Sequence, residues 1–357
     1  MNKFETPKDF RLPAEWEPTD AILMAWPNEN TDWAYMLDDI RKTYIDIITA
    51  ISERAKVVLI GPELPSTSIF PANCRLENLI LVKMPINDTW TRDYGPIIVT
   101  TPDGTPILQD FIFNGWGMKF AANNDNLAAA RLHSSGLLSC LYNGPAQIVL
   151  EGGSIESDGK GTILTTEHCL LAPNRNDYLS QSEIESKLIE QLGAKKILWL
   201  KHGQLAGDDT DGHIDTLARI APPGDIIIYT GCDNPDDEHF AELEAMRNEL
   251  SEMTNAIGAP FHLVELPLPD PIYDPEDGTR LPATYANYLI VNGAVLMPTY
   301  GQPKKDKLAA MILESAMPEY EIIPIDCRSL IRQHGSLHCA TMQLPLGVLS
   351  DNYETNN

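Results

Sequence analysis

Apolar residues along the chain alternate between helical spacing and short continuous runs. The segment Ala34–Arg54 carries apolar residues three and four positions apart, and the run Lys56–Ile60 follows it, ending at Gly61 and Pro62. Such spacing predicts an amphipathic helix, and a short apolar run bounded by turn residues predicts a buried strand. The apolar run Asp20–Trp26 predicts a second buried strand ahead of this helix.

The same helix-then-strand order recurs, giving five predicted helices that each lead into a short apolar strand. The later units are 124–138 with 147–150, 182–192 with 196–200, 239–257 with 261–266, and 304–316 with 320–325. Ser180 or Ser182 can cap the third helix. Hairpin-like pairs of apolar runs lie between the units, at 97–99 with 106–108, 161–164 with 169–171, 216–220 with 225–229, and 287–291 with 294–297.

This fivefold repetition predicts an α/β fold with five strand-helix units around a central site, a fivefold pseudosymmetric α/β propeller. An open, doubly wound α/β sheet is the alternative. No low-complexity linker divides the chain, so we expect one domain over residues 1–357, with an irregular lead-in at 1–19 and a frayed tail at 350–357.

The composition narrows the classes of partner. The 51 acidic and 26 basic residues give a formal net charge of -25, which disfavours nucleic acid and anionic membranes and is compatible with a small cationic substrate. No apolar run reaches the roughly 18 residues of a membrane span, and the N-terminus lacks a signal-peptide core. We therefore expect a cytoplasmic protein with reduced thiols, and the lack of a C-x-x-C pair argues against structural zinc.

Four polar stretches follow predicted strands of different units. Asp93 follows the run 79–82, Glu151 ends the run 147–150, His213 and Asp215 follow 196–200 and a loop, and Cys339 follows 320–325 and a loop. In a radial array these strand ends converge on the axis. We therefore treat the four stretches as one candidate site.

Cys339 is the candidate nucleophile of this site. A free cysteine is usually a small buried hydrophobe, and Cys140, Cys169 and Cys232 fit that description because they lie within or beside apolar runs. Cys339 differs because His334 and His338 flank it and it lies in a glycine-containing loop. Nearby positive charge favours the reactive thiolate.

The stretch 208–215 offers an acid or base. Alternation predicts that His213 and Asp215 share one face of an incoming strand, where the carboxylate can hold the imidazole in one tautomer. A metal loop is the alternative, since four aspartates and a histidine are all ligand types. The calcium-loop pattern fails, because its first and closing ligand positions are Gly207 and Ala218.

The remaining stretches suit a planar cation. The carboxylate of Asp93 can accept hydrogen bonds from such a cation, and the ring of Trp90, three positions earlier, can stack on it. The alternative is that Trp90 packs in the core. Glu151 precedes two glycines that permit close backbone approach, although such a segment is more often a turn. Trp116 either lines a pocket or packs in the core. A thiol, an imidazole and three carboxylates together fit a guanidinium whose central carbon the thiolate attacks.

The motifs that carry these residues form a recognisable set: TWTRDYGP (89–96), FNGWG (113–117), EGGS (151–154), GHIDTLAR (212–219) and SLHCATMQLP (336–345). From about Asp20 to Pro345 the chain resembles the agmatine deiminase and bacterial, Porphyromonas-type peptidylarginine deiminase-like family of the guanidino-group-modifying, or pentein, superfamily. The resemblance implies a fivefold α/β propeller, in agreement with the five predicted units.

The resemblance also implies roles for the matching residues. It implies a single catalytic deiminase domain with Cys339 as nucleophile, His213 as general acid and base, Asp93 and Asp215 as guanidinium-binding carboxylates, Glu151 as a supporting carboxylate, and Trp90 and Trp116 lining the substrate. The implied reaction converts agmatine to N-carbamoylputrescine and ammonia, on the route to putrescine, through a covalent thiouronium. It needs no metal or organic cofactor, and a homodimer is compatible with it.

Three alternatives stay open. The substrate could be arginine or peptidylarginine, giving citrulline, and the far end of the pocket decides between these and agmatine. The chain could be a non-catalytic relative that binds guanidinium compounds. It could also be a metal-dependent hydrolase that uses the cluster 208–215, in which case EDTA would abolish its activity.

Overall fold

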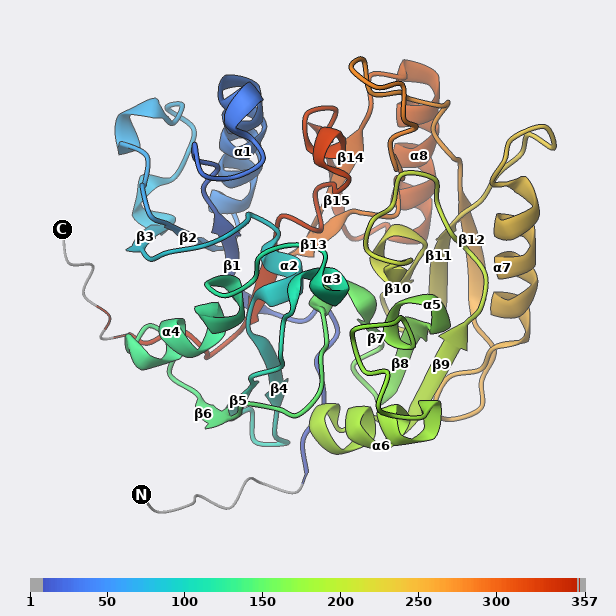
Figure 1. Ribbon diagram of the computed structural model, residues 1–357, viewed down its shortest axis with the longest axis horizontal. Helices are drawn as coiled ribbons and strands as arrows, with labels where there is room; N and C mark the ends of the chain where they lie inside the picture. The colour runs from blue at the N-terminus through green and yellow to red at the C-terminus, as the bar shows by residue number, and fades with distance from the viewer. Residues whose placement is uncertain (1–8, 352, 354–357) are drawn as a thin grey trace.

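A computed structural model describes residues 9–351 and 353 (Figure 1). The chain has a mixed α/β fold in which short strands lie inside and the longer helices lie towards the periphery. The helices of the described residues are α1 (Leu37–Ser52), α2 (Thr91–Tyr94), α3 (Gly115–Met118), α4 (Ala128–Ser134), α5 (Glu167–Leu170), α6 (Gln181–Leu192), α7 (Phe240–Glu252) and α8 (Pro303–Ala316).

The strands of the described residues form five separate sheets. Four of these sheets each contain three strands that are consecutive in the sequence. They are β4 (Ile97–Thr100), β5 (Pro106–Gln109) and β6 (Leu141–Asn143); β7 (Glu156–Ser157), β8 (Thr162–Thr166) and β9 (Lys196–Leu200); β10 (Ala218–Ala221), β11 (Ile226–Thr230) and β12 (His262–Leu266); and β13 (Leu289–Val291), β14 (Ala294–Thr299) and β15 (Glu321–Asp326). The fifth joins β16 (Met342–Pro345), β1 (Thr19–Ala25), β2 (Lys56–Gly61) and β3 (Leu79–Lys83).

One pairing pattern is common to all five sheets. An antiparallel pair is followed by a parallel pair, as in β4–β5–β6 and in β16–β1–β2. Parallel neighbours need a crossover connection, and α1, α4, α6, α7 and α8 each lie in one of these connections. Five helix-then-strand units are therefore present, four of them with the predicted strand and the second with a different strand, β6. The open, doubly wound sheet is wrong, because the strands do not form one continuous sheet.

Some predicted elements match the structure closely, whereas the helices predicted over 124–138 and 239–257 are shorter than expected. Strand β9 has the predicted bounds, and α6 begins one residue before its prediction. Ser180 caps α6 through a capping box, in which its side chain accepts from the backbone of Glu183 and the Glu183 carboxylate accepts from the Ser180 N–H. The predicted helix over Ala34–Arg54 begins as a short 3₁₀ turn and continues as α1.

Two of the apolar runs predicted as strands are not strands. The strand of the second unit is β6, since β5 pairs in parallel with Leu141–Asn143 and not with residues 147–150. Residues 148–150 contribute only a single bridge, from Val149 to Ile112, past the end of β5, and Val149 is otherwise bonded to the side chain of Asn176. The run 169–171 is no strand either, because the Thr166 side chain accepts from the N–H of Cys169 at 3.2 Å and caps helix α5. Strand β8 pairs instead with β7.

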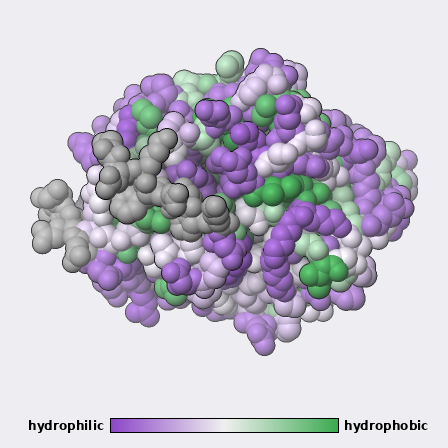
Figure 2. Space-filling view, turned by 90° about the horizontal axis from the view of Figure 1, so that it is seen from below, coloured by the Kyte–Doolittle hydropathy of each residue, from purple (hydrophilic) through white to green (hydrophobic). Residues whose placement is uncertain are grey.

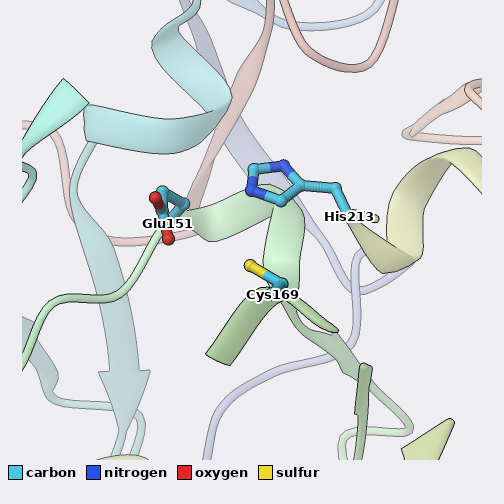
Figure 3. Close-up of side chains that lie close together, drawn as sticks. All are labelled: Glu151, Cys169 and His213. Carbon is cyan, nitrogen blue, oxygen red and sulfur yellow. The ribbon is translucent and has the colours of Figure 1, made fainter. Parts of the chain in front are cut away.

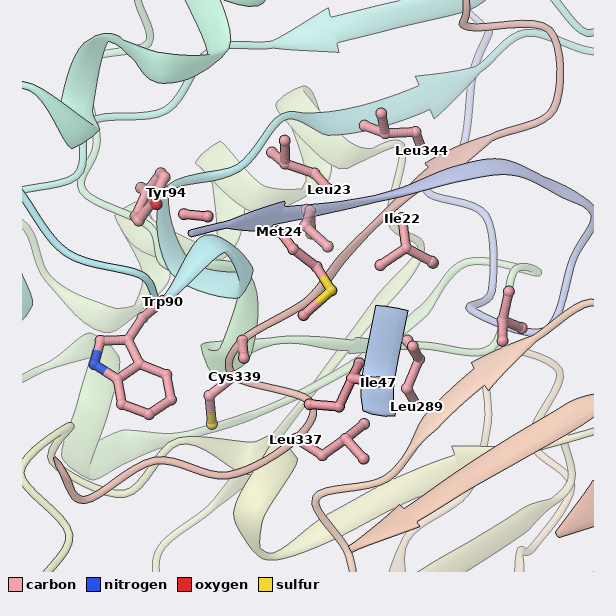
Figure 4. Close-up of a cluster of buried hydrophobic side chains, with 14 of the residues drawn as sticks. Ile22, Leu23, Met24, Ile47, Trp90, Tyr94, Leu289, Leu337, Cys339 and Leu344 are labelled. Carbon is pink, nitrogen blue, oxygen red and sulfur yellow. The ribbon is translucent and has the colours of Figure 1, made fainter. Parts of the chain in front are cut away.

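The last strand brings the ends of the chain together. Strand β16 pairs with β1 in the register Thr19↔Pro345 and Leu23↔Met342, so the segment before β16 lies against the first sheet. Figure 4 shows Cys339 there, at the edge of a buried cluster that includes Leu23, Met24 and Leu337. The predicted lead-in is irregular from residue 9 to β1, with a single bridge between Arg11 and Thr100; residues 1–8, 352 and 354–357 lie outside the described residues.

The visible surface is mostly polar. Figure 2 shows one face on which hydrophilic residues predominate and hydrophobic residues occur in small, separate groups. None of the helices in the described part of the chain has the length and apolar character needed to cross a membrane.

Candidate active site

A hollow of about 650 Å³ holds most of the predicted site residues. Its lining comes from segments far apart in the sequence, namely Asp32, Asp88, Trp90, Asp93, Trp116, Phe120, Asp209, Thr210, Gln333, His334, Gly335 and Cys339. The convergence predicted from the strand ends is therefore observed for Asp93 and Cys339. His213, Asp215 and Glu151 lie behind this lining, fully buried.

The thiol of Cys339 faces a carboxylate and an amide. Cys339 lies in the turn 337–340 just before β16, with its Sγ 3.7 Å from Asp215 Oδ2. Asn287 Nδ2 donates to the sulfur at 3.3 Å, a contact that the sequence did not indicate. Burial, then the charges of Asp215 and Asp93, raise the pKa of Cys339 well above its ordinary value of 9.0. Without a bound cation the sulfur is therefore a thiol.

The two predicted guanidinium-binding carboxylates differ in how they are held. Asp93 Oδ1 accepts from the N–H of Gly153 at 3.0 Å, and Asp93 Oδ2 accepts from Trp116 Nε1 at 2.9 Å. Asp215 Oδ2 lies 2.7 Å from His338 Nδ1. Asp215 Oδ1 is buried and has no hydrogen-bond partner among the described residues. Because buried polar atoms are normally paired, Asp215 Oδ1 is available to a donor from a bound ligand.

The surroundings of these carboxylates shift their pKa values in opposite directions. Burial raises the pKa of Asp93 to about 6, against the opposing charge of His213. Burial alone would raise the pKa of Asp215 too, but the hydrogen bond and charge of His338 outweigh it and lower that pKa below 3.8. At neutral pH both carboxylates are therefore ionised and can bind a cation.

His213 lies beside Asp93 and Glu151. Its Nδ1 is 3.5 Å from Asp93 Oδ1, and neither ring nitrogen has a hydrogen-bond partner among the described residues. Burial would lower the pKa of His213, but Asp93 and then Cys169 outweigh it and raise that pKa well above 6.5. His213 precedes a 3₁₀ helix, Ile214–Thr216, so the predicted shared strand face is wrong.

Glu151 is close to His213, as the predicted supporting role requires. Its Oε1 accepts from Arg175 Nε at 2.8 Å, and Figure 3 shows Glu151, His213 and Cys169 pointing toward one another. Ligand-type atoms of these three residues lie within 4.8 Å of one another. The sequence assigned Cys169 to the core. It is indeed fully buried, but it borders the site as well.

Gly153 provides the space in which the ionisable side chains meet. A Cβ atom at this position would lie 2.7 Å from Asp93 Oδ1, 2.7 Å from His213 Nδ1 and 3.2 Å from Asp215 Oδ2. Three side chains from two segments, one carrying Asp93 and one carrying His213 and Asp215, therefore surround one backbone position. The predicted close approach at the two glycines after Glu151 is confirmed.

Replacement of Gly153 by alanine should lower kcat/KM by about 10²-fold or more, because the methyl group displaces the carboxylates and imidazole. Steady-state kinetics on the purified variant would measure this effect. The matched control is Gly136→Ala, where the added Cβ meets nothing within 4 Å and only the positive φ is unfavourable. Equal activity of Gly153→Ala and the native chain would contradict the geometry.

Both predicted tryptophans line the hollow and also pack in the core. The Trp90 ring lies 5.6 Å from that of Trp33, and a Cβ on Gly335 would lie 2.4 Å from the Trp90 ring. Trp116 adopts a left-handed backbone conformation (φ 55°) that turns its indole N–H onto Asp93. The two alternatives considered for each residue, pocket wall and core, therefore both apply.

A buried ionic network supports Asp215 from behind. His338 Nε2 lies 2.6 Å from Glu15 Oε2, which also accepts from Arg219 Nη2 at 2.9 Å and lies 3.5 Å from Arg92 Nη2. His338 thus connects Glu15, a residue of the lead-in, to the carboxylate beside Cys339. No pattern in the sequence indicated the role of Glu15, since 323 positions separate it from His338.

The carboxylates of the loop 208–215 do not gather around one point. Asp208 accepts from Thr210 and from the N–H of Gly212. Asp211 pairs with Lys119 at 2.8 Å and with Arg175 at 2.5 Å. These bonds occupy Asp208 and Asp211, and no three ligand-type side chains of this loop gather closely enough among the described residues to form the metal site considered as an alternative.

Comparison with known proteins places the chain in a family. The family model for Porphyromonas-type peptidyl-arginine deiminase matches residues 11–345. A Marinomonas protein named "Putative agmatine deiminase" is 34% identical, with 94% of each chain covered.

Two solved structures are similar over nearly their whole length. The Porphyromonas gingivalis protein named "Putative Arginine Deiminase" is 46% identical, with a TM-score of 0.89 and coverage of 96% of this chain and 99% of that one. A cysteine-to-serine variant of C. jejuni agmatine deiminase with substrate bound is 36% identical, with a TM-score of 0.87 and coverage of 98% and 100%. The chain therefore belongs to the Porphyromonas-type peptidyl-arginine deiminase family.

Proposed function

We propose that this protein is a hydrolytic deiminase that converts agmatine to N-carbamoylputrescine and ammonia. The observation that carries the proposal is one thiol, Cys339, at the wall of a hollow beside two buried carboxylates, Asp93 and Asp215. This arrangement binds a planar cation and puts a nucleophile beside it. The relatives named agmatine deiminase support the same reaction.

In the proposed reaction Asp93 and Asp215 hold the guanidinium by hydrogen bonds. The bound cation offsets the negative charges that keep Cys339 protonated, so its pKa falls, the thiol proton passes to water, and the thiolate attacks the central carbon. His213, held near Glu151, protonates the departing nitrogen, and ammonia leaves. His213 then takes a proton from a water molecule that attacks the thiouronium carbon. The ureido product leaves and the sulfur is free again.

The lining of the hollow favours agmatine over arginine. Three further carboxylates line it, those of Asp32, Asp88 and Asp209, and no lysine or arginine is among the lining residues. Lys119, the basic residue nearest in sequence to Trp116, is bound to Asp211 and to the carbonyl of Asp209. An ammonium group suits this lining, whereas the carboxylate of arginine would meet like charge.

We add to the proposal the arrangement of the sheets, the domain organisation, the compartment and the oligomeric state. The shared pairing pattern of the five sheets, and the closure of the fifth by β16, support a fivefold pseudosymmetric propeller around the site. Because the site residues come from segments between 90 and 339, we expect the chain to act as a single catalytic domain. A catalytic cysteine must stay reduced, and thiols are kept reduced in the cytoplasm, so we expect the protein to be cytoplasmic. A homodimer remains a prediction that light scattering can test.

A product assay tests the proposed function. Agmatine, arginine and a blocked arginine peptide are each incubated with the protein, and ammonia and ureido product are quantified. We expect one ammonia per ureido group, with kcat/KM highest for agmatine and no loss of activity in EDTA. Absence of ureido product from all three would refute deimination and favour a non-catalytic relative. Higher kcat/KM for arginine or the peptide would refute the substrate assignment, and loss in EDTA would favour a metal-dependent hydrolase.

The raised pKa of Asp93 predicts an acid limit to activity. Only the carboxylate binds the guanidinium well, so kcat/KM for agmatine should fall as the pH is lowered through about 6. The pH profile of kcat/KM measures this limit. The Trp116→Phe variant removes a hydrogen bond that lowers this pKa, so its acid limit should move to higher pH. A profile that is flat across this range would contradict the role of Asp93.

A further inference from the structure

Cys169 is held beside two site residues although the proposed reaction does not use it. Helix α5 carries Cys169, and the Thr166 hydroxyl that caps this helix also donates to the carbonyl of Gly212 at 2.7 Å. Gly212 directly precedes His213. The cap therefore fixes Cys169 relative to His213, and the sulfur lies within 4.8 Å of ligand-type atoms of both His213 and Glu151.

The polar atoms around this sulfur lack partners. Glu151 Oε2 and both ring nitrogens of His213 are buried and have no hydrogen-bond partner among the described residues. Figure 3 shows a ring nitrogen of His213 turned toward Glu151 and Cys169. Buried polar atoms are nearly always paired, so three such atoms around one sulfur indicate a place for a ligand.

The donor set is that of a thiophilic divalent cation. Thiolate, imidazole and carboxylate are the ligands that Zn²⁺ takes, with bonds of about 2.0–2.3 Å, which places tetrahedral ligand atoms about 3.3–3.8 Å apart. The observed separations are at most 4.8 Å, so small side-chain movements suffice. Among residues 9–351 and 353, this is the one group of three or more such side chains gathered closely enough.

The local charge permits a cation. Arg175 opposes one, but its Nε engages Glu151 Oε1 and leaves Oε2 free. Arg175 Nη1 is also paired with Asp211 at 2.5 Å. A thiolate and a carboxylate would balance the two charges of Zn²⁺, and Asp93 Oδ1, 3.5 Å from His213 Nδ1, adds a third negative group nearby.

We propose that Glu151, Cys169 and His213 form a latent site for Zn²⁺ or a similar thiophilic cation, and that its occupation inhibits the enzyme. The hollow comes close to this site, since Asp93 lines it and Asp93 Oδ1 lies 3.5 Å from His213 Nδ1. A bound ion takes the lone pair of His213 with which that residue would accept a proton. The inhibition rests on the proposed function, whereas the binding site does not.

Cobalt binding tests the site without any assay of activity. The Cys339→Ala protein removes the catalytic thiol as a rival ligand, and Co²⁺ reports thiolate ligation by a sulfur-to-metal charge-transfer absorption. We expect one equivalent of Co²⁺ to produce this absorption. We expect the absorption to disappear in Cys339→Ala/Cys169→Ser and to remain in Cys339→Ala/Cys327→Ser, since Cys327 is equally buried. No absorption at excess Co²⁺, or its survival without Cys169, would overturn the proposal.

A measurement that leaves Cys169 unchanged covers the case in which the serine variant does not fold. Zinc X-ray absorption of the Cys339→Ala protein with one equivalent of Zn²⁺ should give a coordination shell with one sulfur and otherwise nitrogen and oxygen. A shell without sulfur would overturn the proposed site.

The inhibitory role is tested separately in protein that keeps Cys339. Zn²⁺ should inhibit Cys169→Ser at least about tenfold more weakly than the native chain, since one ligand is lost. Equal inhibition of the two would overturn the inhibitory role. If no chain deiminates any substrate, the proposed function fails while the cobalt result still decides the site.

Discussion

Replacement of Cys339 by alanine should lower kcat for agmatine by about 10⁴-fold or more. The covalent route is lost with the sulfur, and no other thiol lines the hollow among the described residues. The carboxylates of Asp93 and Asp215 stay in place, so agmatine should still bind. The measurement is single-turnover kinetics for kcat, with calorimetry for binding.

Cys327→Ala is the matched control for this prediction. Cys327 is a fully buried free cysteine like those assigned to the core, and it does not line the hollow. Its replacement should lower stability through the small cavity that it leaves and should keep most of the activity. The assignment of the nucleophile would be contradicted if Cys339→Ala kept full activity, or if Cys339→Ala and Cys327→Ala lost activity equally.

Replacement of Arg219 by alanine should lower the free energy of unfolding by about 3–5 kcal/mol. The guanidinium is almost fully buried and pairs with Glu15 at 2.9 Å and with Glu156. It also donates to the carbonyl of Tyr288 at 2.5 Å. Without it, two buried carboxylates lose their main counter-charge, and leaving a buried charge unpaired is strongly destabilising. Denaturant unfolding measures the loss.

An exposed pair of the same kind supplies the comparison. Arg328 pairs with Asp326 at 2.6 Å, but both side chains are more than half exposed. Arg328→Ala should therefore cost no more than about 1 kcal/mol. A loss for Arg219→Ala as small as that for Arg328→Ala would contradict the view that the network behind Asp215 depends on this guanidinium.

The elements that the sequence predicted well have local signals. Helix α6 has a capping box at Ser180, and β9 is a short apolar run after it. The errors occurred where a local cap or a distant partner decides the structure. The apolar run at 169–171 became a helix end because Thr166 caps α5, and the 3₁₀ turn after His213 replaced the predicted strand.

The site was predictable where polar residues interrupt apolar runs and carry reactive groups. Cys339, Asp93, His213, Asp215 and Glu151 were all named from the sequence, and the structure brings them close together. Residues that support them gave no such signal, because their function depends on contacts across the chain.

Glu15 and Asn287 are the clearest of the unpredicted residues. Glu15 reaches His338 across 323 positions, and Asn287 reaches the sulfur of Cys339 across 52. A single carboxylate in an irregular lead-in and a single amide before a strand have no local pattern that distinguishes them. Cys169 was correctly assigned to the core, but its apolar neighbours say nothing about the histidine across from it.

The central claim is that Cys339 forms a covalent bond with the guanidinium carbon. Mass spectrometry of the protein quenched in acid during turnover of agmatine tests it most directly. The account predicts that the peptide containing Cys339 gains the mass of agmatine less one ammonia, and that Cys339→Ala shows no such adduct. Product formation with the Cys339 peptide unmodified, or an adduct on a different residue, would contradict it.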